Sequence, residues 1–392
     1  MKRSQLELRL ADGTVVKSCV SYELHERFSD PLDTFRATIV PAPEQRAMAL
    51  DKLQKGELAV VAVDGHVQGA FMIQTRRTTV SPRNGVVIDI DCVSPIRLLA
   101  ETTVDAPVVS KILSSDRPVL DFVASIVEPF GFTEVQDTGD VAFIKAKTGV
   151  NPKSVATAGN NAKQKDCRAD YNETNLAFIN RVLSRLGVML RCGASDNGLA
   201  LYITAPHYDG KALYTVRQAP ADKGPEGDPF FGDVTITETN EDQFSKCSVF
   251  GTTSDEDAST RANEPKGSAL TTDINATRPP FRASFTFPRK EVFYKDDNTT
   301  NAQRANAVAT HVLGRRAERA FAVSGTVQGL VSSGGVPWTV DTLCRVYVHA
   351  TGLDEVMWIS ERTMRQDAQG GQSTMLTLIP KGYFVLGEIG SN

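Results

Sequence analysis

Paired carboxylates are the residues of this sequence that could do chemistry most directly, because two nearby acidic side chains can cleave a glycosidic bond. Asp89 and Asp91 would lie on the same face of a β-strand, since side chains alternate along a strand. The acidic run at 255–257 and the pair at 296–297 are equally good candidates on loops. An acidic pair on a strand more often faces solvent or a cross-strand Arg or Lys. We therefore predict that none of them is catalytic and that the protein is not an enzyme.

Metal binding and nucleophilic catalysis have little support either. The histidines are far apart, and none has the spacing of a helical metal site. The cysteines are scattered, without a Cys-x-x-Cys motif. No Gly-x-Ser-x-Gly elbow, phosphate-binding loop or dinucleotide-binding glycine pattern occurs. We predict no metal, no cofactor, and idle thiols. The residues concerned are His25, His66, His207, His311, His349, Cys19, Cys92, Cys167, Cys192, Cys247 and Cys344.

Trp338 and Trp358 are the two tryptophans of the chain. Either indole could stack on a sugar ring, as aromatic rings do in glycan sites. Packing inside a closing β-barrel is the commoner use of a tryptophan in such a segment, and we predict it for both.

The composition excludes several classes of function. With 41% hydrophobic and 23% charged residues in 392, it is that of an ordinary globular protein. The formal net charge of −4 disfavours nucleic acid as a surface ligand, because phosphate neutralisation needs clustered Lys and Arg. No window has the roughly 18 uninterrupted apolar residues of a membrane helix. The N-terminus lacks the apolar segment of a secretory signal, so we expect synthesis in the cytoplasm and no membrane-spanning segment.

The elements that would position these residues begin with a β-rich segment at 1–105. Leucines at 6, 8 and 10 alternate with polar residues, as in a half-buried strand. Asx-Gly dipeptides separate further short apolar runs and predict hairpin turns. A small antiparallel barrel or sandwich follows, interrupted by a short helix within 41–54. The turn signals are Asp12-Gly13, Asp64-Gly65 and Asn84-Gly85, and the runs beside the last two are 58–63, 67–73, 76–80 and 86–90.

Residues 106–165 are expected to form a small α/β domain with an exposed loop. An apolar stripe at 120–127 predicts a helix that stops at Pro129-Phe130-Gly131, and Phe143-Ile144 is a candidate strand. The stretch from Lys147 to Lys165 is small, polar and glycine-containing, which predicts an exposed loop. Similar stretches follow at 218–230 and 252–280, and long loops of this kind usually carry function or contact a partner.

A short amphipathic helix is predicted between Cys167 and Leu190. Asn172 and Thr174 are candidate N-caps, and Glu173 places a carboxylate near the unpaired N–H groups of the first turn. Apolar residues then recur at three- and four-residue spacing. Gly187 can adopt the left-handed conformation that ends a helix. The apolar stripe consists of Leu176, Ile179, Val182, Leu183 and Leu186.

Residues 208–392 are expected to form a second β-barrel with long loops. An Ala- and Arg-rich helix near 300–319 precedes a strand at 321–327. A turn ending in Trp338 follows, and a closing hairpin runs from 356–359 to 374–378. The sequence shows no convincing internal repeat, although the two β regions could still be similar in shape.

The helical segment resembles the signature of contractile-tail baseplate hub proteins, which include the late-control protein D group, the Mu-like phage hub and the hub portion of VgrG. That signature is Glu-Ser/Thr-Asp-Leu-x-Phe-Leu-x-Arg-Leu-x-x-x-x-Gly. Here residues 173–181 have the sequence Glu-Thr-Asn-Leu-Ala-Phe-Ile-Asn-Arg, followed by Gly187, so that Asn175 replaces the usual Asp. The C-terminal order of helix, strand, Gly-x-x-Trp turn and hairpin is similar to the last barrel of the Mu-like hub. The run at 90–99 is similar to the end of the first barrel in hub proteins.

The resemblance implies an α+β, β-rich fold with two small antiparallel β-barrels and intervening small α/β domains, as in the VgrG hub. The implied divisions are a first barrel at 1–105, a small α/β domain at 106–165, a segment with the signature helix at 166–207 and a second barrel at 208–392. The residues expected to carry the architecture are Asn172, Glu173, Thr174, Leu176, Phe178, Arg181, Gly187 and Trp338.

The resemblance also implies a function. Three chains would form a homotrimeric ring of six similar barrels, which joins the six-fold tail tube of a contractile phage tail to the three-fold central spike. The ring would serve as a conduit for genome ejection, and phage DNA would pass through it without specific binding. The expected partners are the central spike protein, the tail tube or tube-initiator protein, the tape measure protein and the surrounding baseplate wedge proteins. The expected location is the tail baseplate of the virion, after synthesis in the host cytoplasm.

Two other functions are compatible with the sequence. The protein could be a tail-associated envelope-glycan binding protein or hydrolase, in which case it would bind purified peptidoglycan or release reducing ends from it. It could also be the hub of a non-phage contractile injection system, which neighbouring genes would distinguish from a phage.

Overall fold

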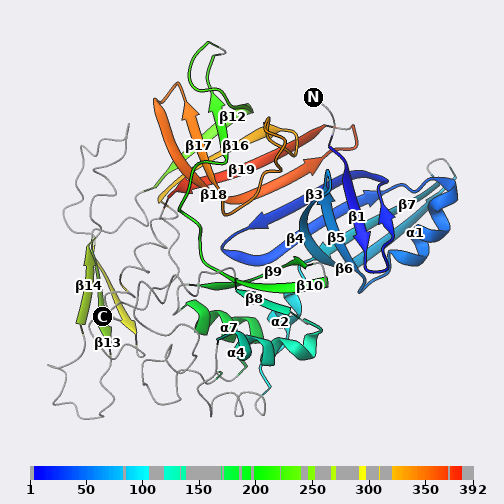
Figure 1. The fold of residues 1–392 in the computed structure, drawn as a ribbon, viewed down its shortest axis with the longest axis horizontal. Helices are drawn as coiled ribbons and strands as arrows, with labels where there is room; N and C mark the ends of the chain where they lie inside the picture. Colours follow the sequence, from blue (N-terminus) through cyan, green and yellow to red (C-terminus); the bar gives the residue numbers. More distant parts are fainter. Residues whose placement is uncertain are drawn as a thin grey trace.

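The computed structural model (Figure 1) describes residues 4–82, 85–105, 119–132, 134–137, 169, 172–184, 188–195, 198–220, 222–239, 246–251, 266–270, 291–296, 309, 320–369 and 371–381. Within these residues the chain is mainly β, and three clusters of buried apolar side chains form its cores. No helix in this part of the chain is long and apolar enough to span a bilayer.

The N-terminal strands form the first barrel, which is blue in Figure 1. They lie in the order β3-β4-β7-β6-β5-β1-β2, and each neighbouring pair is antiparallel. A 3₁₀ turn, η1 (Pro43–Gln45), and a helix, α1 (Arg46–Lys52), connect β4 to β5 and bury Ala49 in the barrel core. The strands are β1 (Leu6–Leu10), β2 (Val15–Val16), β3 (Cys19–Arg27), β4 (Asp30–Ile39), β5 (Leu58–Val63), β6 (His66–Ser81) and β7 (Gly85–Val93).

The second barrel is closed. Its strands lie in the order β17-β11-β12-β16-β19-β18, and β18 pairs again with β17. All these pairs are antiparallel except those of β11, which runs parallel to both of its neighbours. The strands are β11 (Tyr214–Gln218), β12 (Asp228–Glu238), β16 (Phe321–Gln328), β17 (Leu343–Val348), β18 (Leu353–Gln366) and β19 (Gln372–Pro380).

Strand β18 belongs to both barrels. Its first half, 353–358, pairs with β17, and its second half, 361–366, pairs with β3 of the first barrel. The two barrels are therefore one sheet of 13 strands, and one cluster of buried side chains runs through both. We call the contact between β18 and β3 the joint. It lies between the two barrels in the centre of Figure 1.

A small α/β unit lies below the first barrel in Figure 1. The strands β8 (Glu134–Asp137), β10 (Gly198–Thr204) and β9 (Met189–Ser195) form its sheet, in that order. Its separate apolar core contains the predicted stripe residues 176, 179, 182 and 183. Its helices are α2 (Arg97–Glu101), α4 (Val119–Val127), η2 (Glu128–Phe130) and α7 (Asn175–Ser184).

A further sheet has the strand order β14-β13-β15, from β13 (Lys246–Gly251), β14 (Lys266–Leu270) and β15 (Glu291–Asp296). Sequence analysis placed loops at 218–230 and 252–280, but β12 begins at Asp228 and β14 lies inside the second range. The predicted loop at 147–165, the candidate strand Phe143-Ile144 and, apart from Ala309, the helix near 300–319 lie outside the described residues.

The predicted fold class is confirmed: the chain is β-rich, with two barrels and a small α/β unit that lies between them in the sequence. Asp64 and Gly65 both have positive φ, as a tight hairpin turn requires. One detail was wrong. The apolar runs 67–73 and 76–80 form a single strand, β6, which bends at an extra residue, Gln74, where its register with β7 shifts.

Candidate functional site

The signature helix α7 begins at a side-chain cap. The Thr174 hydroxyl accepts a hydrogen bond from the N–H of Ala177 at 3.2 Å, which is the geometry of an N-cap. Asn172, the other candidate cap, is exposed and has φ 62°, so it forms the turn before the helix instead. Gly187, the predicted C-cap, lies outside the described residues.

Asn175 fastens the start of this helix to the end of α2. Its side-chain amide donates to the carbonyls of Thr102 and Thr103 and to the Thr102 hydroxyl, at 3.0–3.2 Å. Asn175 is buried, and its backbone N–H also donates to the Thr102 carbonyl. An aspartate here could not donate these side-chain hydrogen bonds. The departure from the hub signature therefore suits this local environment.

Glu173 and Arg181 form a clamp across the first turns of α7. Arg181 donates from Nε and Nη2 to the two Glu173 oxygens, each at 2.8 Å, which is the two-pronged geometry that makes Arg–carboxylate pairs strong. The same guanidinium lies 5.3 Å from the Phe178 ring centre. Phe178 is fully buried and packs edge-on against Phe122 at 5.6 Å, while Leu176 is buried in the same core. These signature residues thus hold α7 in place.

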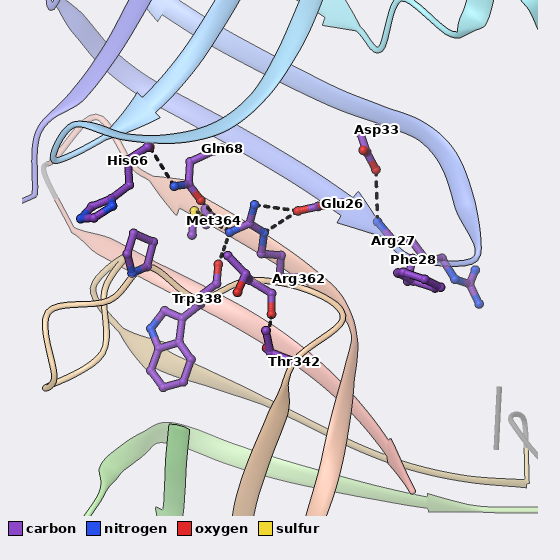
Figure 2. Close-up of polar contacts among 12 residues, drawn as sticks. Glu26, Arg27, Phe28, Asp33, His66, Gln68, Trp338, Thr342, Arg362 and Met364 are labelled. Atoms are coloured by element: carbon purple, nitrogen blue, oxygen red, sulfur yellow. Dashed lines mark hydrogen bonds and ion pairs between the residues drawn. The ribbon is translucent and has the colours of Figure 1, made fainter. Parts of the chain in front are cut away.

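At the joint, a buried arginine fixes the two barrels to each other (Figure 2). Arg362 on β18 is 2% exposed and donates from Nε to Glu26 on β3 at 2.7 Å. Its Nη1 donates to Gln68 on β6 at 2.8 Å and to the Trp338 carbonyl. A buried guanidinium needs such partners because each unmatched charge or N–H would lose its hydration. Arg362 therefore connects three segments that are far apart in the sequence.

The small α/β unit also contacts the Glu26 carboxylate. Arg191 on β9 donates from Nη2 to Glu26 at 2.8 Å and to Asp33 on β4 at 3.2 Å. Its Nη1 donates to the Arg27 and Phe28 carbonyls. Burial raises the pKa of the Asp33 carboxyl to about 7, and the Arg191 guanidinium opposes that rise. Two arginines and two carboxylates therefore meet where the three units touch.

Sequence analysis missed this cluster. The available signal was a charged residue on the inward face of an alternating strand. Arg362 takes an inward position beside Met364 on β18, and Glu26 follows Leu24 on the inward face of β3. A charge in such a position needs an opposite charge, but the sequence does not name the partner, because Arg362 and Glu26 are 336 positions apart.

Both tryptophans are fully buried. Trp338 packs against Tyr214 at 4.6 Å inside the second barrel. Trp358 packs against Phe28 and Tyr208, and its indole N–H donates to Asp341 at 2.9 Å. Neither ring offers a face to a sugar. The prediction of packing inside the barrel is confirmed for Trp338 but is wrong for Trp358, which belongs to a separate apolar cluster with Phe28, Leu343 and Ile379.

The candidate carboxylates on β7 contact residues of the neighbouring strand. Asp89 accepts a hydrogen bond from the Thr38 hydroxyl at 2.7 Å, and Asp91 lies 3.2 Å from Arg36. Both line a groove of about 400 Å³ on the outer face of the joint, together with Glu23 and Arg365, which form an ion pair of 2.6 Å. The charges that line this groove are largely matched within the protein.

The other candidates for chemistry are not brought together. His207 contacts Asp341 at 2.5 Å and fastens the segment before β11 to the second barrel. In the part of the chain that is described, no three His, Cys, Asp or Glu side chains are placed to hold a metal ion. Burial raises the pKa of the Cys19, Cys92 and Cys192 thiols to about 12, which leaves them unreactive. His311, Cys167, the run 255–257 and Asp297 lie outside the described residues.

Comparison with known proteins gives matches in structure but not in sequence. No family model matches the chain, and no curated protein matches it. A tail protein from Neisseria meningitidis has a TM-score of 0.70 and 15% identity, with 98% of each chain covered. The 43 kDa tail protein of prophage MuSo2 from Shewanella oneidensis has a TM-score of 0.67 and 14% identity, with 97% of this chain and 99% of that chain covered.

A third similar structure is a chain of the Francisella PdpA–VgrG complex, with a TM-score of 0.54 and 9% identity. The match covers 100% of this chain and 60% of the other. At these identities the matches establish the fold, and the fold is that of baseplate hub-like tail proteins. The resemblance found in the sequence is therefore confirmed at the level of the fold.

Proposed function

We propose that the chain is a structural baseplate hub of a contractile phage tail, which forms a trimeric ring between the six-fold tail tube and the three-fold central spike. The observation that carries this proposal is the pair of barrels joined edge to edge in one sheet. Three such chains supply six barrels. One face of the ring can therefore present six similar units to the tail tube, while the ring as a whole has three-fold symmetry. The ring would serve as a conduit for the genome.

The similar structures support this proposal. Two of them are tail proteins that match this chain over nearly its whole length, and a third is a chain of the PdpA–VgrG complex. By the same reasoning we propose as partners a central spike protein, the tail tube or tube-initiator protein, the tape measure protein and the wedge proteins. We retain the divisions 1–105, 106–165, 166–207 and 208–392 as part of the proposal.

The residues of the described site also fit a mechanical role better than a chemical one. Glu173, Arg181, Arg191 and Arg362 join elements to one another through paired charges. Such contacts fix the relative positions of the barrels and the small unit. A hydrolase would need a carboxylate pair in a groove with one member free to take up a proton. In the groove at the joint, Asp91 and Glu23 lie beside arginines, and Asp89 accepts a hydrogen bond from the Thr38 hydroxyl.

The proposal can be tested with particles that lack the chain and are complemented with variants. We expect Phe178→Asp to abolish infectious or injection-competent particles, because a charge in this buried position displaces α7. Ala177→Asp is the matched control, since Ala177 is the exposed neighbour on the same helix and should complement fully. Particles with normal titre and complete baseplates in the absence of the chain would contradict the proposal.

A further inference from the structure

The two barrels follow the same strand plan, although no repeat is visible in the sequence. The first runs β3-β4-β7-β6-β5-β1 and the second β12-β16-β19-β18-β17-β11. In both, a six-residue strand (β5, β17) leads through a turn with a positive-φ glycine, Gly65 or Gly352, into the longest strand of the barrel. That long strand is β6 in the first barrel and β18 in the second.

The registers of the two barrels also agree around one bulge in each long strand, although the β5–β6 ladder has a further shift, between Val61 and Ala62, that the β17–β18 ladder lacks. β6 has its extra residue at Gln74, two positions after Met72, which pairs with Leu58 at the start of β5. β18 has its extra residue at Ser360, two positions after Trp358, which pairs with Leu343 at the start of β17. Counting from these bulges, 75–80 on β6 correspond to 361–366 on β18.

The same correspondence extends to the first strand of each barrel. Leu24 on β3 pairs with a residue of β4 that in turn pairs with Cys92 on β7. In the same way, Ile236 on β12 pairs with a residue of β16 that in turn pairs with Leu378 on β19. Cys92 and Leu378 pair with the residue just before each bulge, Ile73 and Ile359. Residues 22–26 on β3 therefore correspond to 234–238 on β12.

The two copies differ in how the outer edge of the long strand is covered. The outer edge of β18 at 361–366 is covered by β3, which forms the joint. No strand of the described residues forms a ladder with the corresponding edge of β6 at 75–80, although β9 packs against β6. Val80 is 76% exposed, whereas Gln366, its counterpart on β18, is 7% exposed. A long strand with an open edge and an exposed valine is suited to pairing with another strand.

A matching edge occurs on β12. Beyond its first two residues, which pair with β11, β12 has a described strand neighbour only on its β16 side. β12 corresponds to β3, the strand that covers β18 at the joint. In Figure 1, β12 lies in the upper part of the molecule and β6 in the lower right, on opposite sides of the joint.

The charges at these edges repeat those of the joint. Arg76 on β6 corresponds to Arg362 on β18, and Glu238 on β12 corresponds to Glu26 on β3. At the joint, Arg362 lies directly opposite Glu26 in the ladder, and the two side chains form the buried ion pair. The guanidinium of Arg76 contacts only near neighbours of its own barrel among the described residues, the Leu50 carbonyl and the Thr78 hydroxyl.

We propose that β6 of one copy pairs with β12 of a second copy, in the antiparallel register that β18 and β3 use within the chain. In this register Arg76 lies opposite Glu238, Thr79 opposite Thr235, and Val80 opposite Val234. Such β-branched cross-strand pairs stabilise sheets. The inference rests on the proposed function in that a ring of three chains is the assembly in which these edges meet.

The contact is head-to-tail, because each chain contributes one β6 edge and one β12 edge. A head-to-tail contact forms a closed ring when its rotation divides a full turn evenly. If the contact between chains repeats the joint within the chain, all barrels of the ring are related by similar rotations, and three chains give six barrels.

A cysteine cross-link tests the register. In the full-length chain, Thr79→Cys and Thr235→Cys are combined and oxidised under mild conditions, and covalent species are sized on non-reducing gels. We expect closed covalent trimers from the double variant and no species larger than a dimer from either single variant. The internal control is Glu23→Cys with Arg365→Cys, whose residues lie opposite each other in the joint and should cross-link within one chain.

A shifted pair makes the result specific. Thr79→Cys with Thr237→Cys moves one cysteine two residues along β12 on the same face, and its cross-linking should fall at least about fivefold, because diagonal neighbours are farther apart than direct partners. Equal cross-linking of the shifted pair would overturn the register. If the wild-type protein has the mass of three chains but the 79–235 pair does not cross-link, the inference fails while the trimeric hub stands. A monomer without cross-links would overturn both.

Charge reversal in the otherwise wild-type protein tests the same contact independently of the cysteines, with the strength of self-association as the measurement. Arg76→Glu and Glu238→Arg should each weaken self-association at least about tenfold, because each places like charges opposite one another. The double variant R76E/E238R should recover most of the loss. Single variants that associate as well as the wild-type protein would contradict the proposed pairing.

Discussion

The two barrels of this molecule differ in how the long strand of each is covered and in whether the strands close into a ring. In the second barrel, β18 has a strand on both edges over its whole second half, and the ring of six strands closes. In the first barrel, the described strands leave the second half of β6 with one neighbour, and no ladder joins β2 to β3. Within the described residues the plan is therefore complete in one copy and incomplete in the other, and in our proposal a second chain supplies the missing contacts.

The first barrel is completed in part by side chains of the second. Gln372 on β19 donates from its amide to the Ser4 carbonyl at 2.7 Å and accepts from the Ser4 N–H at 3.0 Å, as a backbone partner would. Gln366 donates to the Val20 carbonyl at 3.0 Å. The first barrel thus depends on the second for its closure, whereas the second closes through its own strands.

The largest expected effect comes from breaking the joint. Arg362→Ala should destabilise the protein by about 3–5 kcal/mol, because it leaves Glu26, whose side chain is 15% exposed, without its partner on β18. The change is measured by denaturant unfolding of the full chain. Arg76→Ala is the matched control, since it removes the corresponding residue at the uncovered edge, and it should change the stability of the isolated chain by less than about 0.5 kcal/mol. Equal losses of stability in the two variants would contradict the claim that the edge of β18 is covered within the chain and the corresponding edge of β6 is not.

A smaller effect is expected at the glutamine contact. Gln372→Leu should cost about 1–3 kcal/mol, because it removes both partners of the Ser4 backbone. Hydrogen exchange should then increase in β1 and leave the second barrel protected. Gln328→Leu, at the exposed end of the neighbouring strand β16, serves as the control and should have little effect. An unchanged exchange rate in β1 would show that the first barrel closes without this contact.

The smallest effect concerns pH. The raised pKa of Asp33 means that the folded protein binds a proton there, near pH 7, that the unfolded chain binds only near its ordinary value of 3.8. This group therefore adds stability as the pH falls from 8 towards 5, and the gain is lost as the pH rises through 7. Asp33→Asn should remove this component of the pH dependence, while Asp30→Asn, exposed on the same strand, should retain it. A parallel pH profile for wild type and Asp33→Asn would contradict the assignment.

The sequence predicted the features that depend on residues close to one another along the chain. The cap at Thr174, the apolar stripe of α7 and the Asp64-Gly65 turn depend on residues within one or two turns of chain. The fold class followed from short alternating strands and from the resemblance to hub proteins. The joint could not be predicted, because it pairs strands at opposite ends of the sequence, and neither could the shared strand plan, because strand register is conserved between the barrels while side-chain identity is not.

The measurement that tests the central claim most directly is the absolute mass of the full-length protein in solution, by light scattering over a range of concentrations. The account predicts about three times the 42.5 kDa chain mass, and a fall towards a single chain for Arg76→Glu. A wild-type protein that has the mass of one chain at every concentration would contradict the claim that the uncovered edges of the two barrels join copies of this chain into a ring.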